Sequence, residues 1–254
     1  MRLTLSHITL PLALLLSAVT AQVASAAAPA PWPRAVVQSE PRAVVELFTS
    51  PNCSACPPAD ALFEKLAKSP DLFTLVMPVD LWNRPGRKDT LAVRAFTERQ
   101  MAYADVRNEN TLYTPQAMVN GAVSTNGADA SEIGTAVAQT QSLLSVPVSA
   151  SAAGDDIVVS VGAATSNATP GFITVLPFVA SRTVKAYGER ITYANLVRDI
   201  VRVADWEGKP VRRTVRLRDF SQYDGVVVLL QAGTEQRPGV ILGATRISLS
   251  APKT

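Results

Sequence analysis

The hydrophobic and polar residues of positions 42–80 follow a pattern that predicts a strand, a helix and a second strand. RAVVELFTS (42–50) and DLFTLVMPVD (71–80) are apolar and partly β-branched, as buried strands are. Between them, ADALFEKLAK (59–68) places its apolar residues on one helical face. Two buried strands joined by a helix favour a parallel pair with a crossover connection.

The residues that follow predict a helix, two short strands and a last helix. Residues 89–106 have helical spacing, and QAMVNG after Pro115 is a short strand that forms a hairpin with AVST. A final helix is expected over 128–144, with Asp129 or Ser131 as its N-cap. This order, βαβ, an inserted helix and then ββα, predicts an α/β domain over residues 42–144.

From residue 145 onward the period changes to the alternation that is typical of strands. Several short strands with turn signals between them predict a β-rich, sandwich-like C-terminal domain over residues 145–254. One amphipathic helix is expected among these strands, because five apolar residues there share one helical face: Tyr193, Leu196, Val197, Ile200 and Val201.

The N-terminal residues predict export. A short positive start, an apolar run and the small residues ASA (24–26) indicate a signal peptide, residues 1–26, cleaved after Ala26. The Pro- and Ala-rich residues 27–41 are interpreted as a linker or a surface-bound arm. No later apolar run is long enough to cross a membrane, so the expected protein is periplasmic or secreted and not transmembrane.

Charge and histidine content exclude several classes of function. The net charge of +3 falls to +2 when Arg2 leaves with the signal peptide, and so small a charge does not call for nucleic acid. His7, the only histidine, also lies in the signal peptide, which excludes Ser–His and Cys–His nucleophile pairs from the mature chain. Two cysteines cannot complete a four-thiolate zinc site. No metal and no cofactor is therefore expected.

Cys53 and Cys56, the only cysteines, form a CxxC motif between a buried strand and a helix. The start of a helix favours a thiolate at the first cysteine, and the second is close enough to resolve a mixed disulfide. Pro57 and Pro58 suit the first helical turn, where an N–H has no intrahelical acceptor. The alternative is a structural disulfide, although so small a ring restricts the unfolded chain little.

Two further sites are candidates to support the cysteines. Thr114 and Pro115 precede the short strand, and the order of elements favours a cis Thr114–Pro115 bond close to the CxxC motif. Glu46 shares a strand face with Val44 and Phe48. A buried Glu46 beneath the cysteines would have a raised pKa and could exchange a proton with Cys56. Exposure of Glu46 at a strand edge is the alternative.

Several segments together resemble an exported thioredoxin-like family catalogued as domain of unknown function 1223. They are VVELFTSPNCSACPPAD, VDLW, FTERQMAY, LYTPQAMVNG and LVRDIVRVADWEG, within residues 42–247. The resemblance implies a thioredoxin-like fold with a β-rich C-terminal extension, and it implies no substrate. The positions that match the family pattern are Cys53, Cys56, Pro57, Pro58, Asp60, Asp80, Trp82, Gln100, Tyr103, Tyr113, Thr114, Pro115, Gln116 and Gly121.

The resemblance assigns Asp80, Trp82, Pro57, Thr114 and Pro115 to the support of the cysteines or to substrate docking. The chain departs from the family pattern at three places. Pro78 replaces a histidine, Leu81 replaces a tyrosine, and GRKD (86–89) replaces GWKD. These departures fall on the loop expected to face the CxxC motif, where they would alter a substrate pocket.

Two other features have functional and structural interpretations. Residues 182–218 hold ten Lys and Arg against four Asp and Glu, an excess that predicts either a solvated sheet face or docking to an anionic surface. Met77, Met101 and Met118 could join the cysteines as soft ligands for Cu(I) in a copper carrier. Packing in the core explains these methionines better.

The leading hypothesis is an exported thiol–disulfide oxidoreductase without a cofactor. Cys53 would be the attacking or leaving thiolate, Cys56 the resolving thiol, and the backbone at Thr114 and Pro115 the docking edge. The expected partner is a cysteine-containing protein or a small thiol or disulfide. The alternative is a binding or scaffold module with a structural disulfide, and a Cu(I) carrier is a third hypothesis.

Overall fold

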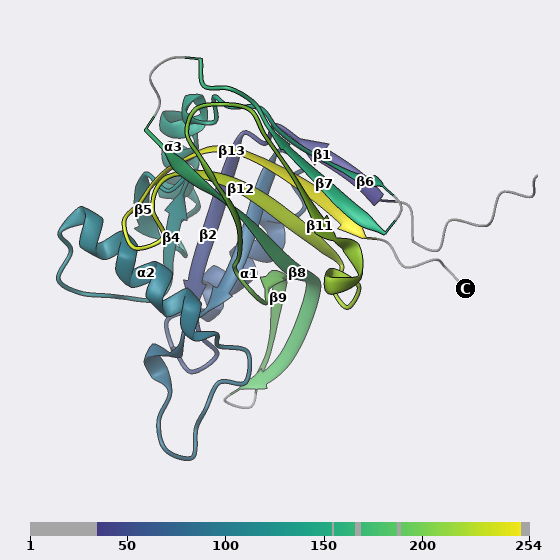
Figure 1. The fold of residues 1–254 in the computed structure, drawn as a ribbon. Coiled ribbons are helices and arrows are strands. Elements are labelled where there is room, and N and C mark those ends of the chain that lie inside the picture. Colours follow the sequence, from purple (N-terminus) through teal and green to yellow (C-terminus); the bar gives the residue numbers. More distant parts are fainter. Residues whose placement is uncertain (1–34, 154, 166–168, 187–188, 250–254) are drawn as a thin grey trace, which may run out of the picture. The chain divides into compact units, whose positions relative to one another are not determined.

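The computed structural model describes residues 35–153, 155–165, 169–186 and 189–249 (Figure 1). They belong to one compact unit, Pro31–Thr254. The predicted signal peptide, residues 1–26, lies outside the described residues. The fold is mixed α/β, with one large sheet, a smaller sheet and few helices.

The first half of the described chain has the predicted order of elements. The strands and helices are β2 (Ala43–Thr49), α1 (Pro57–Leu66), β3 (Leu72–Pro78), α2 (Arg94–Arg107), β4 (Gln116–Val119), β5 (Val123–Asn126) and α3 (Ala130–Thr140). β2 pairs in parallel with β3 and antiparallel with β4, which pairs antiparallel with β5. Asp129 is the N-cap of α3 and accepts the N–H groups of Ser131 and Glu132. The predicted βαβ, helix and ββα order is thus confirmed.

The second half of the described chain is almost entirely strands, as predicted. They are β6 (Val148–Ala153), β7 (Asp156–Val161), β8 (Gly171–Ala186), β9 (Glu189–Val197), β10 (Val201–Trp206), β11 (Val211–Arg216), β12 (Gly225–Gly233) and β13 (Pro238–Leu249). Short 3₁₀ turns occur in both halves of the described chain. They are η1 (Asp80–Trp82) between β3 and α2, η2 (Gln141–Leu143) between α3 and β6, and η3 (Leu217–Phe220) between β11 and β12.

Most of the C-terminal strands extend the sheet of the N-terminal half. The large sheet begins with β1 (Ala35–Ser39) and runs β1-β13-β12-β8-β9-β3-β2-β4-β5, with β10 paired to β8. The junction is a parallel contact in which Val76 of β3 faces Leu196 of β9. Only β11, β7 and β6 form a separate, three-stranded sheet. Strands from both sides of the predicted boundary between residues 144 and 145 therefore share one continuous sheet.

The helix expected around Tyr193 is absent, and the chain there forms β9 and β10. Ile191 and Tyr193 alternate as strand residues toward one face of the sheet. Asn195, with φ of 50°, interrupts the alternation, so Leu196 joins the same cluster as Tyr193. Val197 faces the other cluster. This interruption produces the three-residue spacing that imitates a helix.

The predicted linker, residues 27–41, also contains a strand. β1 (Ala35–Ser39) pairs antiparallel with β13, from Ala35 opposite Leu249 to Ser39 opposite Thr245. Runs of β-branched residues favour an extended chain, and the free edge of β13 offers the backbone partners that such a chain needs.

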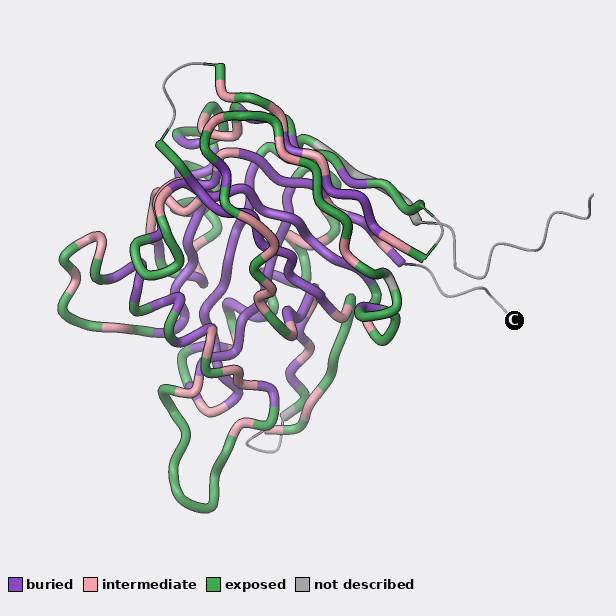
Figure 2. Tube along the Cα trace, viewed as in Figure 1, coloured by how far each residue is buried: buried purple, intermediate pink, exposed green. Residues whose placement is uncertain are grey.

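The central strands of the large sheet consist mainly of buried residues (Figure 2), and their side chains form hydrophobic clusters on both faces. One cluster packs α1 and α3 on the face that carries Val45 and Leu47. A second lies on the opposite face, with Val44, Phe48 and residues of α2. A third joins the three-stranded sheet to β8, β12 and β13. The two faces of β2 therefore belong to different cores, and this division decides which residues meet the cysteines.

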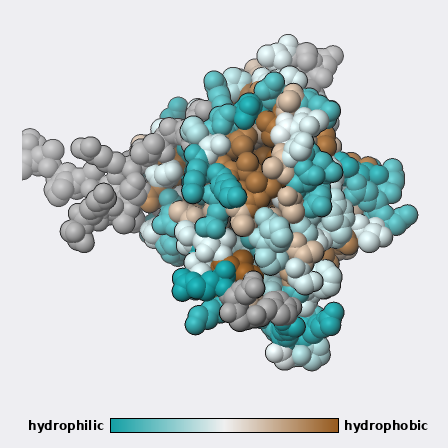
Figure 3. All heavy atoms as spheres, turned by 180° about the vertical axis from the view of Figure 1, so that it is seen from behind, coloured by the Kyte–Doolittle hydropathy of each residue, from teal (hydrophilic) through white to brown (hydrophobic). Residues whose placement is uncertain are grey.

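Among the described residues, no helix is long and apolar enough to cross a membrane. Figure 3 shows the face opposite to the view of Figure 1, where hydrophobic atoms gather at the centre and hydrophilic ones surround them. On the helical side, Leu66 of α1 and Ile133 and Val137 of α3 line a shallow hollow of about 320 Å³.

Candidate functional site

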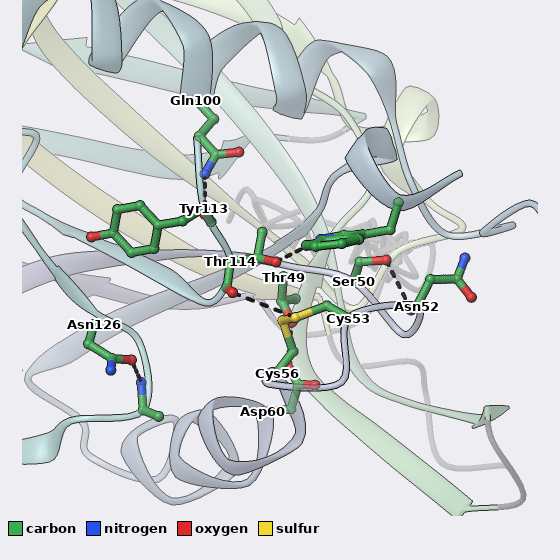
Figure 4. The surroundings of a disulfide bond; sticks show 12 residues. Thr49, Ser50, Asn52, Cys53, Cys56, Asp60, Gln100, Tyr113, Thr114 and Asn126 are labelled. Carbon is green, nitrogen blue, oxygen red and sulfur yellow. Dashed lines mark hydrogen bonds between the residues drawn. A yellow bond between two sulfur atoms is a disulfide. The ribbon is translucent and has the colours of Figure 1, made fainter. Parts of the chain in front are cut away.

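Cys53 and Cys56 are joined by a disulfide where the chain leaves β2 and enters α1 (Figure 4). Turns follow the end of β2 at Thr49, and Cys56 is the N-cap of α1. Cys53 keeps 4% of its surface exposed, whereas Cys56 is fully buried. Cys53 is therefore the more accessible of the two cysteines, although both are buried.

The start of α1 differs from the sequence prediction in one respect. Pro57 and Pro58 occupy the first helical positions, as expected, and carry no N–H. The N–H groups of Ala59 and Asp60 both donate to the Cys56 carbonyl oxygen. The helix therefore offers the cysteines its dipole, while its first four N–H positions supply no free donors to a thiolate.

Residues 113–115, called the Thr114 segment below, lie against the disulfide. The carbonyl oxygen of Thr114 is 3.6 Å from Sγ of Cys53, close enough to accept a hydrogen bond when that sulfur is a thiol. The Thr114–Pro115 bond is cis, as the order of elements predicts. Gln100 of α2 fixes this segment, because its side-chain N–H donates to the Tyr113 carbonyl oxygen at 2.8 Å.

Asp80 and Trp82 hold η1 between α2 and the Thr114 segment. The indole N–H of Trp82 donates to Oγ1 of Thr114 at 2.8 Å. Oδ1 of Asp80 accepts from the Thr97 hydroxyl at 2.5 Å, and Arg94 lies 3.6 Å from its other oxygen. Trp82 is 36% exposed. These residues position the segment beside Cys53, and Trp82 also presents an aromatic surface next to it.

A buried carboxylate lies beneath Cys56 in Figure 4, and it belongs to Asp60. Asp60 is 2% exposed, and its Oδ1 accepts a 2.8 Å hydrogen bond from the Thr49 hydroxyl. Its Oδ2 is buried and has no hydrogen-bond partner among the described residues. Burial raises the pKa of Asp60 to about 7, and the Thr49 hydrogen bond offsets this only in part. Near neutral pH this group can therefore both donate and accept a proton.

Sequence reasoning included Asp60 only as a family match and gave it no role. The available signal was its spacing, because Asp60 follows Cys56 by four residues and so lies on the same side of α1. Its neighbour Ala59 and the later Phe63 are both fully buried. A carboxylate between buried positions at the first turn of the helix indicates an inward orientation.

Glu46 is buried, as one of the two sequence interpretations predicts, but it does not lie with the cysteines. It shares the face of β2 that packs on α2, whereas the cysteines begin α1 on the opposite face. Arg99 binds both of its oxygens, at 2.6 and 3.2 Å, and the Tyr103 hydroxyl donates to it at 2.7 Å. The predicted place of Glu46 beneath the cysteines is therefore wrong on geometric grounds, and Asp60 is the buried carboxylate on the side of β2 where α1 lies.

The methionines do not gather around the cysteines. Met77 and Met118 are fully buried in the cluster that packs on α2, and Met101 is exposed on α2 itself. Among the described residues no group of three or more His, Cys, Asp or Glu side chains has the arrangement of a metal site. The structure thus gives the Cu(I) hypothesis no assembled ligand set.

The basic stretch 182–218 is divided among several elements. Part of it lies on the β8–β9 hairpin and part on β11 of the smaller sheet. Arg202 forms ion pairs with Asp205 and Glu235, and Arg198 donates to the Leu91 carbonyl oxygen. The charges of the hairpin lie near the CxxC loop, which the sequence alone did not indicate.

Comparisons with known proteins identify relatives of the whole fold. The family model described as "Protein of unknown function (DUF1223)" matches residues 44–231. The X-ray structure of protein AGR_C_4864 from Agrobacterium tumefaciens is 33% identical, with a TM-score of 0.75 over 85% of this chain and 98% of that one. HBP35 of Porphyromonas gingivalis is 11% identical, with a TM-score of 0.57 over 85% of this chain and 78% of that one, a likeness of fold alone. No curated protein matches the sequence.

Proposed function

The chain belongs to the family of proteins of unknown function DUF1223, and we propose that it is an exported thiol–disulfide oxidoreductase built on a thioredoxin-like fold. The observation that carries this proposal is the Cys53–Cys56 disulfide at the carboxyl end of a buried strand, where Cys53 keeps 4% of its surface exposed and Cys56 none. A redox couple needs this asymmetry, because one sulfur must meet the partner while the other waits to resolve the intermediate.

The arrangement of elements supports the thioredoxin-like part of the proposal. The sheet order β3-β2-β4-β5 combines a parallel pair with antiparallel neighbours, and helices cover both of its faces. The cysteines follow the central strand β2 and begin α1. The predicted signal peptide supports export, where a disulfide couple can persist.

In the oxidised state, the reaction would begin with a thiolate of the partner. This thiolate attacks Sγ of Cys53, the Cys53–Cys56 bond breaks, and Cys56 leaves with the electron pair and takes a proton from neutral Asp60. A second partner thiolate then attacks the partner sulfur of the mixed disulfide, and Cys53 leaves as a thiolate that takes a proton from solvent. The two partner thiols released two protons to solvent when they ionised, and these balance the protons taken up by Cys53 and by Asp60. The partner loses two electrons and becomes a disulfide, while the protein gains them as a dithiol. The reverse sequence reduces a partner disulfide.

The Thr114 segment has a defined place in this reaction. Its carbonyl oxygen already contacts Sγ of Cys53, and it would accept the hydrogen bond of the Cys53 thiol after reduction. A partner that reaches Cys53 must lie along this segment, which Trp82 and Gln100 hold in place. Thr114 and Pro115 would therefore form the docking edge for the partner backbone.

A binding or scaffold module with a permanent disulfide is the second candidate. The low exposure of Cys53 favours it, since a bridge of this kind exchanges slowly with thiols in solution. This candidate leaves the unpartnered, buried Oδ2 of Asp60 without a purpose.

Wild-type protein tests the proposal directly in two assays. We expect it to accelerate either the reduction of insulin by dithiothreitol or the refolding of reduced ribonuclease A. The first assay requires the dithiol form of the couple, and the second requires the disulfide form. An equal amount of serum albumin is the control for nonspecific effects. Rates at the uncatalysed level in both assays would contradict the proposal.

Replacing Asp60 with asparagine should slow exchange about 10–100-fold at pH 7, because the variant cannot pass a proton to or from Cys56. The pH profile of the exchange rate should lose its inflection near 7, the pKa of Asp60. Stopped-flow measurement of the rate between pH 5 and 9 checks both. An unchanged inflection in Asp60→Asn would remove Asp60 from the mechanism.

The pH dependence of the free energy of unfolding, compared between the wild type and Asp60→Asn, tests the raised pKa of Asp60 independently of the exchange rate. Its pKa is raised from 3.8 to about 7 by burial, so the folded state holds a proton that the unfolded chain releases. The contribution of Asp60 to the free energy of unfolding is present below pH 4 and is lost as the pH rises through 7. Urea titrations should show a loss of about 4 kcal/mol over this range in the wild type. The loss should be absent in Asp60→Asn.

A further inference from the structure

We propose that a basic cleft beside Cys53 binds acidic side chains of the partner peptide that carries the reacting cysteine, an inference that rests on the proposed function. The cleft has a volume of about 260 Å³. Pro51 and Asn52 form one wall, residues 87–91 the second, and residues 184–186 of β8 the third. Because Cys53 directly follows Asn52, the cleft borders the reactive end of the disulfide.

Two segments that are far apart in the sequence bring cations to this cleft. The loop before α2 contributes Arg87 and Lys88, and the β8–β9 hairpin contributes Lys185. In Figure 1 this loop and this hairpin extend toward the same end of the large sheet, the end at which β2 stops. The amide of Asn52 also donates to the Arg87 carbonyl oxygen at 3.5 Å, which ties the CxxC loop to the cleft wall.

Two of these cations, Lys88 and Lys185, lie outside the ion pairs of the described side chains. Both are exposed. Lys185 pairs directly across the hairpin with Arg190, so two like charges stand side by side on one strand pair. Such a pair is destabilising unless an anion lies near it. An acidic ligand would relieve this repulsion.

Among the side chains that the structure describes, Asp89 is the one acidic group that lines the cleft, and one of its oxygens is bound by the backbone. Oδ1 of Asp89 accepts the Leu91 N–H at 2.8 Å, and Asp89 is partly buried. Arg198 lies close enough to lower the pKa of Asp89, although burial raises it more strongly. Two exposed lysines, Lys88 and Lys185, thus line the cleft with one partly buried carboxylate, and this balance favours an anionic guest.

The size and place of the cleft favour a peptide segment as the guest. Its volume holds about two side chains, since pockets for larger ligands begin at roughly 300 Å³. The Thr114 segment offers a backbone edge at the disulfide. A peptide can place its cysteine at Cys53 and its neighbouring aspartates or glutamates in the cleft at the same time.

Peptide binding to the full oxidised chain tests this inference without requiring exchange. The probes are three fluorescein-labelled peptides with a central serine in place of cysteine, flanked by aspartates, by lysines or by serines. Fluorescence anisotropy at low salt should show the aspartate peptide binding about tenfold more tightly than the serine peptide, with no measurable binding of the lysine peptide.

Charge reversal at the cleft supplies the matched comparison. Lys88→Glu combined with Lys185→Glu should weaken the aspartate peptide about tenfold, whereas Lys209→Glu in the distant β10–β11 turn should leave it within twofold. All three lysines are exposed, so these variants should fold normally. Equal affinity for the three peptides, or an unchanged affinity in the double variant, would overturn the inference.

Exchange with the cysteine forms of the same peptides separates this inference from the proposed function. The double variant should react with the serine-flanked peptide at the wild-type rate and lose only its preference for aspartate. Exchange without any charge preference would overturn the acidic partner and leave the oxidoreductase in place. Selective binding of the aspartate peptide without exchange would support the cleft and contradict the oxidoreductase.

Discussion

Replacing Arg99 with leucine should lower the free energy of unfolding by about 3–5 kcal/mol. The guanidinium is 7% exposed and contacts the fully buried Glu46 at 2.6 Å, so the variant leaves a buried carboxylate without its countercharge. Arg99 also donates to Tyr103 and Gln231, at 2.8 and 2.9 Å. Denaturation by urea at pH 7, followed by circular dichroism, measures the change.

The reason for so large an effect is that this network joins three elements in the core. Glu46 comes from β2, Arg99 and Tyr103 from α2, and Gln231 from β12. Gln231 itself donates to the Tyr103 hydroxyl at 2.8 Å and to the Gly239 carbonyl oxygen at 2.8 Å. The ion pair therefore helps to hold the C-terminal strands against the helix that fixes the Thr114 segment.

Arg94→Leu is the matched control on the same helix. Arg94 is 63% exposed and pairs with Glu98 and Asp80 at the surface, so its replacement should change stability by less than about 1 kcal/mol. A double variant, Glu46→Leu with Arg99→Leu, should recover much of the loss, because it removes both buried charges. Equal effects of Arg94→Leu and Arg99→Leu would show that the buried pair is not the source of the stability.

Replacing Cys53 with serine should reduce disulfide exchange about a thousandfold or more. A serine hydroxyl is not ionised near neutral pH and cannot form the mixed disulfide. Cys56→Ser should behave differently, because it keeps the reachable cysteine and removes only the resolving thiol. We expect the Cys53 thiolate of Cys56→Ser to attack a disulfide-linked peptide dimer, release one peptide thiol and accumulate a stable mixed disulfide with the other peptide, detected by mass spectrometry.

Ser54→Ala is the control for this pair of variants. Ser54 is exposed, lies between the cysteines and has no role in the proposed chemistry, so its replacement should leave the rate within about twofold of the wild type. Wild-type rates in Cys53→Ser would assign the activity to another part of the molecule. A mixed disulfide that forms on Cys56 in Cys53→Ser, and not on Cys53 in Cys56→Ser, would reverse the assigned roles.

The N-terminal part of the fold could be predicted from the sequence because its signals are local. Buried strands such as β2, the Asp129 N-cap and the prolines of α1 each act within a few residues. The join of β9 to β3 depends on a contact between Val76 and Leu196, which are 120 positions apart. No local pattern carries that information, and the left-handed Asn195 made the strand imitate a helix.

The candidate site was predicted in part for the same reason. The cysteines and Thr114 carry strong motifs, but the buried carboxylate was assigned to Glu46 when Asp60 is the one beneath Cys56. Both residues lie in buried surroundings, so apolar neighbours alone could not separate them. Glu46 lies on the face of β2 that packs on α2, whereas α1, which carries Asp60, packs on the other face. This difference becomes known only when α1 and α2 are placed on opposite sides of the sheet.

The measurement that tests the central claim most directly is the reduction potential of the Cys53–Cys56 couple. Equilibration of the full chain with defined glutathione mixtures, read by alkylation of free thiols, gives the value. A working redox couple should lie between about −120 and −270 mV. A value below about −300 mV would mark a bridge that resists exchange and would contradict the oxidoreductase in favour of a structural disulfide.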